Sequence, residues 1–238
     1  MADRSPPTKI RILAFDDADE LDAIAPYEIL VTVGQILKNA PLDVKIVSVN
    51  GTTKDPNVVA GIHGLTFGTE PWDDCEPEIL IVVGGGYGEK TKDVGIKKVM
   101  GIKAFTGVIA EQNRAGRQLV SVCTGAFGLV GAGVVAGRRM TTHPLALDDL
   151  AAKGARVLNP DWQARVVDDG NIISCGGVTS GTDVALYLAE AFWPGAPSLI
   201  SRLRGIVDYN FVATVAVPEP PVSAETRRAA PARHRRAG

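Results

Sequence analysis

The chain has 238 residues, of which 45% are hydrophobic, 22% charged and 5% aromatic, with 26 glycines and 15 prolines. This length and this apolar fraction are typical of one globular domain, and they exclude a wholly disordered or collagen-like chain. The formal net charge of −2 hides two unequal parts: five arginines and two glutamates give residues 218–238 a charge of +3, so the preceding 217 residues carry −5. An acidic body argues against a nucleic-acid-binding core, and we expect no nucleic-acid partner.

The cysteines and the N-terminus indicate the compartment. Three cysteines cannot form a disulfide framework, and their odd number leaves at least one free thiol. The polar segment Met1–Thr8 contains no apolar signal-peptide core. No apolar run approaches the roughly 18 residues that suggest a membrane span. We therefore expect a cytoplasmic protein with reduced thiols and no membrane contact.

The first half of the chain alternates strand and helix patterns. Lys9–Phe15 predicts a buried strand, and helical spacing follows over Asp19–Leu37. Asp43–Val49 and Glu78–Val83 predict the next two strands of a sheet. Between them, the residues 50–76 are rich in Gly, Pro and Thr, which predicts a hairpin and a loop.

The second half continues the alternation. The predicted elements are a helix over 96–115, a strand over Gln118–Val122, a helix over Gly125–Ala136, a short strand over Arg139–Thr142, a helix over Leu145–Lys153, a hairpin of Ala164–Asp168 and Asn171–Ser174, and helices over Val178–Phe192 and Ser198–Phe211. An Asp-Gly pair predicts the hairpin turn. Strands that alternate with helices predict an open, mostly parallel sheet covered on both faces.

These patterns divide the chain into three parts. Residues 1–8 are predicted to be a disordered N-terminus, and residues 9–215 a single α/β domain. Residues 216–238 combine four prolines, several alanines and the arginine cluster, so they cannot bury enough apolar surface to fold. We expect them to form a flexible basic tail in solvent.

Cys123 is the strongest candidate for a nucleophile. Ligands of open α/β sheets bind at the carboxyl ends of the strands. Here a β-branched strand ends at Cys123, and the small residues Gly125 and Ala126 then open a helix, which is the pattern of a nucleophile elbow. The free N–H groups of a helix start are expected to favour a thiolate and to receive an anionic intermediate. Cys75 and Cys175 lack this context and are expected to be structural thiols.

Two further strand ends carry candidate groups. The loop Gly84-Gly85-Gly86 lets backbone N–H groups approach a substrate, but it matches neither a phosphate loop nor a dinucleotide fingerprint. Asp22 lies on the apolar side of the first predicted helix, where an inward carboxyl needs a partner. In its protonated form, Asp22 can donate to a thiolate or to a substrate atom.

The histidines offer one more candidate. His143 follows Cys123 by 20 residues at a predicted strand end, so it is either an acid/base or a structural residue. His63 and His234 have no such context. Because no group of His, Cys and acidic residues has metal-ligand spacing, we expect no catalytic metal.

Four separate motifs carry a family resemblance. The elbow V-C-T-G-A at 122–126 resembles that of the ThiJ/PfpI superfamily, which is glutamine amidotransferase-like (class I). The supporting motifs, in the same order as in that family, are L-D-A-I-A-P-Y-E-I-L at 21–30, A-G-x-x-x-G-R-R-x-T-T-H at 132–143 and G-G-V-T-S-G-x-D-x-A-L at 176–186. The resemblance spans residues 9–211 and is greatest to the isocyanide hydratase branch and to the amidase-like domains of AraC-type regulators.

The resemblance implies a flavodoxin-like three-layer α/β sandwich that forms a homodimer and needs no cofactor. By position, Cys123 would attack the substrate, and Asp22 would activate water or shuttle protons. The N–H groups of Gly86 and Thr124 would form the anion site, and Thr124 follows the nucleophile as in the hydratase branch. Thr179 would contact the residues of the site without touching the substrate.

The resemblance also ranks the activities. It favours a lyase that adds water to a small isonitrile to give an N-substituted formamide. Thr124 stands where the peptidase branch has His, and Asp22 stands where the glyoxalase and deglycase branch generally has Glu, so both activities are less favoured. Three further functions stay open: an amidase-like activity, a redox-sensing or regulatory domain without turnover, and a paralogue that has lost its chemistry.

Overall fold

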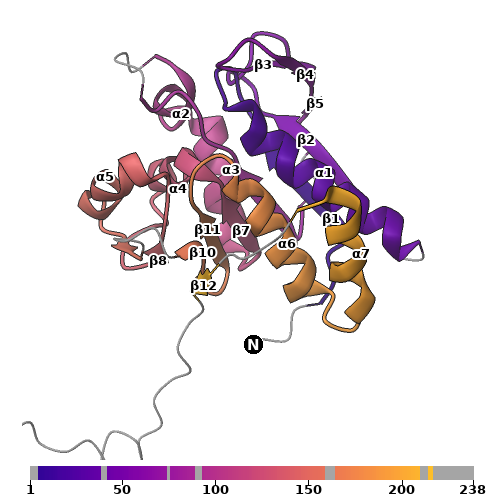
Figure 1. Cartoon of the computed structure of the whole chain (residues 1–238). Coiled ribbons are helices and arrows are strands. Elements are labelled where there is room, and N and C mark those ends of the chain that lie inside the picture. Colours follow the sequence, from indigo (N-terminus) through magenta and orange to yellow (C-terminus); the bar gives the residue numbers. More distant parts are fainter. Residues whose placement is uncertain are drawn as a thin grey trace, which may run out of the picture.

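The computed structural model describes residues 5–38, 42–73, 76–88, 93–158, 164–209 and 214–216. Within them an eight-stranded sheet has the order β12-β10-β11-β7-β6-β1-β2-β5 (Figure 1). Its strands are β1 (Lys9–Leu13), β2 (Asp43–Ser48), β5 (Glu70–Pro71), β6 (Ile79–Val82), β7 (Gln118–Ser121), β10 (Ala164–Asp168), β11 (Ile172–Cys175) and β12 (Thr214–Ala216). All neighbouring pairs are parallel except β10 and β11. The predicted mostly parallel α/β sheet is therefore confirmed.

Two groups of helices cover this sheet. Helices α1 (Glu20–Leu37), α6 (Ser180–Phe192) and α7 (Pro197–Val207) pack against one another on the face turned to the viewer in Figure 1. Helices α2 (Gly95–Val99), α3 (Lys103–Arg114) and α4 (Ala126–Gly131) pack together on the other face. The central strands are buried on both faces, as Ile12 of β1 and Ile81 of β6 illustrate. Helices on both sides of a parallel sheet explain why β6 is apolar throughout and why β1 is apolar apart from Lys9 and Arg11.

Two small sheets lie outside the central one. Strands β3 (Val58–Ala60) and β4 (Thr66–Gly68) form an antiparallel hairpin, which confirms the hairpin predicted within 50–76. Strands β8 (Arg139–Met140) and β9 (Arg156–Val157) pair in parallel around the 3₁₀ turn Pro144–Ala146 and α5 (Leu147–Ala152). The two-residue strand β9 was not predicted, because so short a segment has no periodicity to read.

The largest differences between predicted and observed helix bounds concern three helices. The helix predicted over 96–115 is two helices, α2 and α3, with a break that contains Gly101. The helix predicted over Gly125–Ala136 ends at Gly131, since Gly133 adopts a φ of +73°. The last helix ends at Val207, where Asp208 adopts the left-handed conformation. Glycine and Asp tolerate that conformation, so these turns end helices that apolar spacing alone would extend.

Some predictions fall outside the described residues. Residues 1–4, Cys75, Phe211 and His234 are among these, as are residues 217–238 of the predicted tail. Within the described part of the chain, Thr8 donates to Glu78 at 3.1 Å, and β12 reaches Ala216. No described helix has the length and apolar character that a bilayer crossing requires.

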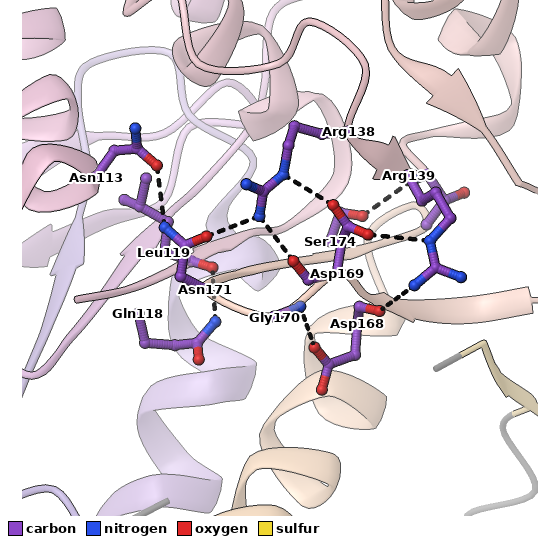
Figure 2. Close-up of polar contacts among 11 residues, drawn as sticks. Asn113, Gln118, Leu119, Arg138, Arg139, Asp168, Asp169, Gly170, Asn171 and Ser174 are labelled. Carbon is purple, nitrogen blue, oxygen red and sulfur yellow. Dashed lines mark hydrogen bonds and ion pairs between the residues drawn. The ribbon is translucent and has the colours of Figure 1, made fainter. Parts of the chain in front are cut away.

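A polar network fixes the segment that leads to His143 (Figure 2). Asp169, in the β10–β11 turn, pairs with Arg138 at 2.8 Å and with Arg139 at 3.0 Å. Arg138 also donates to the Asp169 carbonyl and to Asn171, both at 2.7 Å. Gly170 adopts a φ of +84°, as the predicted Asp-Gly turn requires. The turn thus holds β8, whose following residues reach the elbow.

Candidate active site

Cys123 lies at a tight strand-to-helix turn. Strand β7 ends at Ser121, a 3₁₀ turn spans Cys123–Gly125, and α4 follows. Cys123 has a φ of +55°, a strained value for a residue with a side chain. A Cβ atom at Gly125 would lie 2.1 Å from the Val82 carbonyl oxygen, so only glycine allows this close approach. The predicted nucleophile elbow is therefore present.

Other strands brace this turn. The Cys123 N–H donates to the Gly176 carbonyl at 2.9 Å, and the Thr142 hydroxyl donates to the Cys123 carbonyl at 2.8 Å. The Thr141 N–H donates to Ser174 at 2.9 Å. These bonds connect the elbow to β11 and to the segment after β8, so the strained conformation is held from two sides.

Asp22 lies against the Cys123 thiol. It is fully buried on the first turns of α1, and its Oδ2 accepts the Gly84 N–H at 2.9 Å. Its carboxyl contacts Cys123, but Oδ1 makes no hydrogen bond of ordinary geometry within the described part of the chain. Burial raises the pKa of Asp22 well above its usual range, and the charge of Asp19 acts in the same direction. The raised pKa favours the protonated carboxyl, which can donate a proton.

The environment of the thiol differs from the sequence prediction. Cys123 is 5% exposed. Burial raises the pKa of its thiol and the charge of Asp22 adds to this, whereas the N–H groups of Val178 and Thr124, which point at the sulfur, lower it. Burial thus opposes the resting thiolate that the sequence predicts, and it outweighs the N–H groups at the turn.

The glycine loop connects these residues. The Gly85 N–H donates to Thr124 Oγ1 at 3.0 Å, and a Cβ at Gly84 would lie 2.5 Å from the same oxygen. Gly86 is partly exposed in this loop and has a φ of +65°. No hydrogen bond joins Gly86 to Cys123 or Thr124 in the residues described, so its part in an anion site stays a prediction.

Val178 was missed by the sequence analysis. It has a φ of +26°, which is unfavourable for a β-branched side chain, and its N–H points at the Cys123 sulfur. Its position between Gly177 and Thr179 is the only sequence signal, and that signal does not single out a valine. Val178 is thus, beside Thr124, a residue whose backbone N–H lowers the pKa of the thiol.

His143 and Thr179 lie at the turn that carries Val178. His143 Nδ1 accepts the Leu145 N–H at 3.2 Å, which leaves Nε2 for proton transfer. Its ring packs on Gly177, where a Cβ would lie 2.5 Å from His143 Cδ2. The exposed Thr179 accepts a hydrogen bond from Arg165 at 3.0 Å. Both residues touch the turn that carries Val178, and their roles stay predictions.

Cys175 and the surface pockets are not part of the candidate reacting group, and Cys75 lies outside the described residues. Cys175 is buried beneath the elbow, and burial raises the pKa of its thiol. A pocket of about 310 Å³ lies beside α3 and Trp72, and one of about 540 Å³ lies between α1 and β2. Neither is lined by Cys123 or Asp22, so neither marks the site of the thiol.

The fold also brings together possible metal ligands. Asp19, Glu20 and His63 each offer a ligand atom, and these atoms lie within 4.8 Å of one another. No spacing rule reveals this group, because His63 is 43 residues from Glu20. The expectation of no catalytic metal rested on spacing along the sequence, and it stays a prediction.

Comparison with known proteins establishes the family. The model of the DJ-1/PfpI family matches residues 8–191. This chain belongs to that family. The match includes Asp22, the elbow and the turn at Val178, and the predicted ThiJ/PfpI resemblance is confirmed.

Relatives within the family have different activities. An isonitrile hydratase of Pseudomonas putida is 32% identical over 183 residues, which cover 76% of this chain and 71% of the relative. A deglycase of Pyrococcus abyssi is 29% identical over 175 residues, which cover 70% of this chain and 88% of the relative. Family membership is therefore shown, and the family includes more than one activity.

Solved structures share the fold. A ThiJ/PfpI family protein from Pseudomonas syringae matches with a TM-score of 0.67 at 24% identity, covering 96% of this chain and 83% of its own. Drosophila melanogaster DJ-1beta matches with a TM-score of 0.69 at 15% identity, covering 86% and 99%. The flavodoxin-like α/β fold of the family is thus confirmed.

Proposed function

We propose that this chain is a cofactor-independent enzyme of the isonitrile hydratase type, with Cys123 as nucleophile and Asp22 as proton relay. The observation that carries the proposal is the contact between a buried carboxyl and a buried thiol at the elbow. Asp22 Oδ1 lacks a hydrogen bond of ordinary geometry in the described region, so it is available to a reacting group. The Pseudomonas putida relative supports the choice of substrate.

The proposed reaction has two stages. In the first, Cys123 Sγ bonds to the terminal carbon of the isonitrile while the thiol proton passes through Asp22 to that carbon, which gives a thioimidate. In the second, water adds to this carbon and its proton passes through Asp22 to the nitrogen. The C–S bond then breaks, the thiol regains its proton, and an N-substituted formamide leaves. One isonitrile and one water are consumed, and the enzyme is unchanged.

The surrounding N–H groups have a defined part in this scheme. Those of Thr124 and Val178 point at the sulfur, so they stabilise negative charge there when the proton leaves. Gly86 would extend this anion site, and His143 Nε2 would exchange protons at the entrance. Thr179 would support the turn through Arg165.

A glyoxalase- or deglycase-like activity is the second candidate, because two relatives of this chain are deglycases of Pyrococcus species. The shorter carboxyl of Asp22 leaves room for water, which favours hydration. A redox-sensing role is less supported, because burial raises the pKa of the Cys123 thiol and oxidation needs the thiolate.

We also propose a homodimer with a small-molecule substrate and a cytoplasmic location. Exposed apolar side chains on and beside α1, namely Leu21, Tyr27 and Leu65, support a dimer by offering surface to cover. Cys123 and Cys175 are free thiols, which supports a reducing compartment. Sedimentation of the purified chain tests the dimer.

An activity panel tests the proposed chemistry. We expect turnover of cyclohexyl isocyanide, measured as formamide production, and little turnover of methylglyoxal or small amides. Cys123→Ala and Asp22→Asn should each lower turnover by at least about 1,000-fold, because nucleophile and relay act as one unit. Cys175→Ala, which removes a thiol just behind the elbow, is the matched control and should keep activity. Full activity in either site variant contradicts the mechanism.

The same panel separates the two candidate activities. Asp22→Glu introduces the residue that the deglycase branch generally has at this position. We expect this variant to have a lower isonitrile turnover than the wild type. Wild-type turnover of methylglyoxal with none of the isonitrile would replace the proposal by the second candidate.

A further inference from the structure

A group of possible ligands lies beside the thiol, at the start of α1. Asp19 directly precedes α1, Glu20 begins it, and His63 lies in the turn between β3 and β4. Figure 1 shows this hairpin above the start of α1. Asp19 is close enough to Asp22 and Cys123 for its charge to act on both. The group is therefore next to the proposed catalytic residues without being part of them.

Glu20 is held in one orientation. Its Oε1 accepts the N–H groups of His63 at 2.9 Å and of Leu65 at 3.2 Å. Its Oε2 lies 2.8 Å from His63 Nδ1, and its side chain is only 10% exposed. A Cβ at Gly61 would lie 2.3 Å from Glu20 Cγ, so the turn leaves room for this carboxylate only because residue 61 is glycine. A carboxylate oxygen and an imidazole nitrogen are thus fixed side by side.

Asp19 brings a second carboxylate to the same place. Its N–H donates to the Gly84 carbonyl at 3.0 Å, and a Cβ at Gly85 would lie 2.2 Å from the Asp19 nitrogen. The backbone of Asp19 is therefore locked against the glycine loop. One atom each of Asp19, Glu20 and His63 lie within 4.8 Å of one another. In a tetrahedral site with bonds of about 2.0–2.2 Å, ligand atoms lie somewhat closer than this, and the exposed His63 ring can move inward.

We propose that Asp19, Glu20 and His63 form a binding site for a divalent transition-metal cation, with Zn²⁺ as the ion that fits best. Two carboxylate oxygens and one imidazole nitrogen are a donor set that zinc accepts, with a fourth position left to water. Mg²⁺ and Ca²⁺ prefer sites made of oxygen alone. The bound ion would replace the hydrogen bond between Glu20 and His63, and it would tie the β3–β4 turn to the start of α1.

The competing account is an ordinary ion pair. Glu20 and His63 alone would suffice to close the hairpin turn, and Asp19 would then be a bystander. The two accounts differ in the part of Asp19: a metal site needs it, whereas an ion pair does not. In a third account the nearby thiol binds zinc, and that binding would need Cys123 and none of the other three residues.

Zinc titration of the purified, metal-free chain tests the site. Calorimetry should show one Zn²⁺ per chain, and His63→Ala and Asp19→Asn should each weaken its binding by at least about tenfold, since even groups behind metal ligands have effects of that size. His234→Ala is the matched control, because it also removes one imidazole, and Cys123→Ala removes the thiol. Both should leave the affinity unchanged.

A second measurement identifies the ligands. Co²⁺ in place of Zn²⁺ should give visible absorption bands without a sulfur-to-cobalt charge-transfer band, and Mg²⁺ should not displace it. Zinc should raise the melting temperature of the wild-type chain and not that of His63→Ala. Equal zinc affinity in the wild type, His63→Ala and Asp19→Asn would overturn the site, as would loss of binding in Cys123→Ala alone. Zinc binding is measured without turnover, so Cys123→Ala should lose the proposed activity and still bind zinc. The metal site and the proposed function can therefore be overturned separately.

Discussion

The loops after β6 and β11 lie on either side of Cys123 and both bring backbone N–H groups to the candidate site. They differ in the backbone conformation that they use. The loop after β6 approaches Asp22 and Thr124 with glycines, of which Gly85 and Gly86 have φ values of +133° and +65°. The loop after β11 places Val178 at +26° and directs its N–H at the thiol. A glycine adopts positive φ without strain, whereas a β-branched residue stores of order 1–3 kcal/mol there.

The two loops thus have different structural requirements. The glycine loop needs close backbone contact, whereas the Val178 loop holds a strained backbone conformation. In the glycine loop, side chains are excluded because other backbone lies where a Cβ would be. In the Val178 loop, a side chain is present, and the surrounding structure holds it in an unfavourable conformation. His143 packs on this turn and Arg165 bonds to it, so both help to hold it. We therefore expect substitutions in the glycine loop to act through steric overlap. Substitutions of Val178 should act by releasing its strained conformation.

Gly85→Ala is expected to have the largest effect of the variants that compare the loops. Its Cβ would lie 2.2 Å from the Asp19 nitrogen in a left-handed conformation, so overlap and strain together should destabilise the fold by roughly 3 kcal/mol or more. The displaced loop should move the Gly84 N–H away from Asp22 and lower turnover by about 100-fold. Thermal unfolding and formamide production measure the two effects.

Gly88→Ala is the control for this change. Gly88 belongs to the same loop, and a Cβ there meets no atom within 4 Å. Its stability and turnover should match those of the wild type. Equal behaviour of the two alanine variants would show that close approach is not what the glycines provide.

Val178→Gly should affect turnover more than stability. Glycine relieves the strain but loses the valine contacts and adds unfolded-state freedom, so the free energy of unfolding should change by no more than about 1 kcal/mol. The N–H is then no longer held at the sulfur, and turnover should fall by about tenfold, since one hydrogen bond to a developing charge is worth about 1.5 kcal/mol or more. Melting curves and kcat together test this split.

Val178→Ile is the matched variant for that experiment, because it keeps a β-branched side chain on a partly exposed position. It should retain the strain, the N–H contact and the turnover. If Val178→Gly were as active as the wild type, the strained conformation would have no part in the chemistry.

The contrast between the loops also explains what the sequence could reveal. Cys123 and Asp22 were found because each breaks a local pattern, one at the end of an apolar strand and the other on the apolar side of a helix. The glycine loop was visible for the same reason. Val178 was not, since β-branched residues disfavour positive φ and the local sequence points to an extended or helical conformation.

Features that depend on tertiary contacts escaped prediction for a related reason. Glu20 and His63 meet only because the β3–β4 hairpin folds over the start of α1. The raised pKa of the Cys123 thiol comes first from burial, whereas the sequence showed only the helix start that opposes it. Local patterns thus indicated the alternation of strands and helices and the proposed reacting pair, while long-range packing set the electrostatic environment of that pair.

Thr179→Val should have the smallest effect, and it refines the account of the second loop. It removes one exposed hydrogen bond from Arg165, which we expect to cost about 0.5–1 kcal/mol of stability. Arg165 still pairs with the buried Asp183, so the turn should stay in place and turnover should change by less than about threefold. Thr179→Ser, which keeps the hydroxyl, should restore both values. A loss of turnover as large as that of Cys123→Ala would instead show that the Thr179 hydroxyl acts on the substrate, because removal of one exposed contact behind the turn cannot produce it.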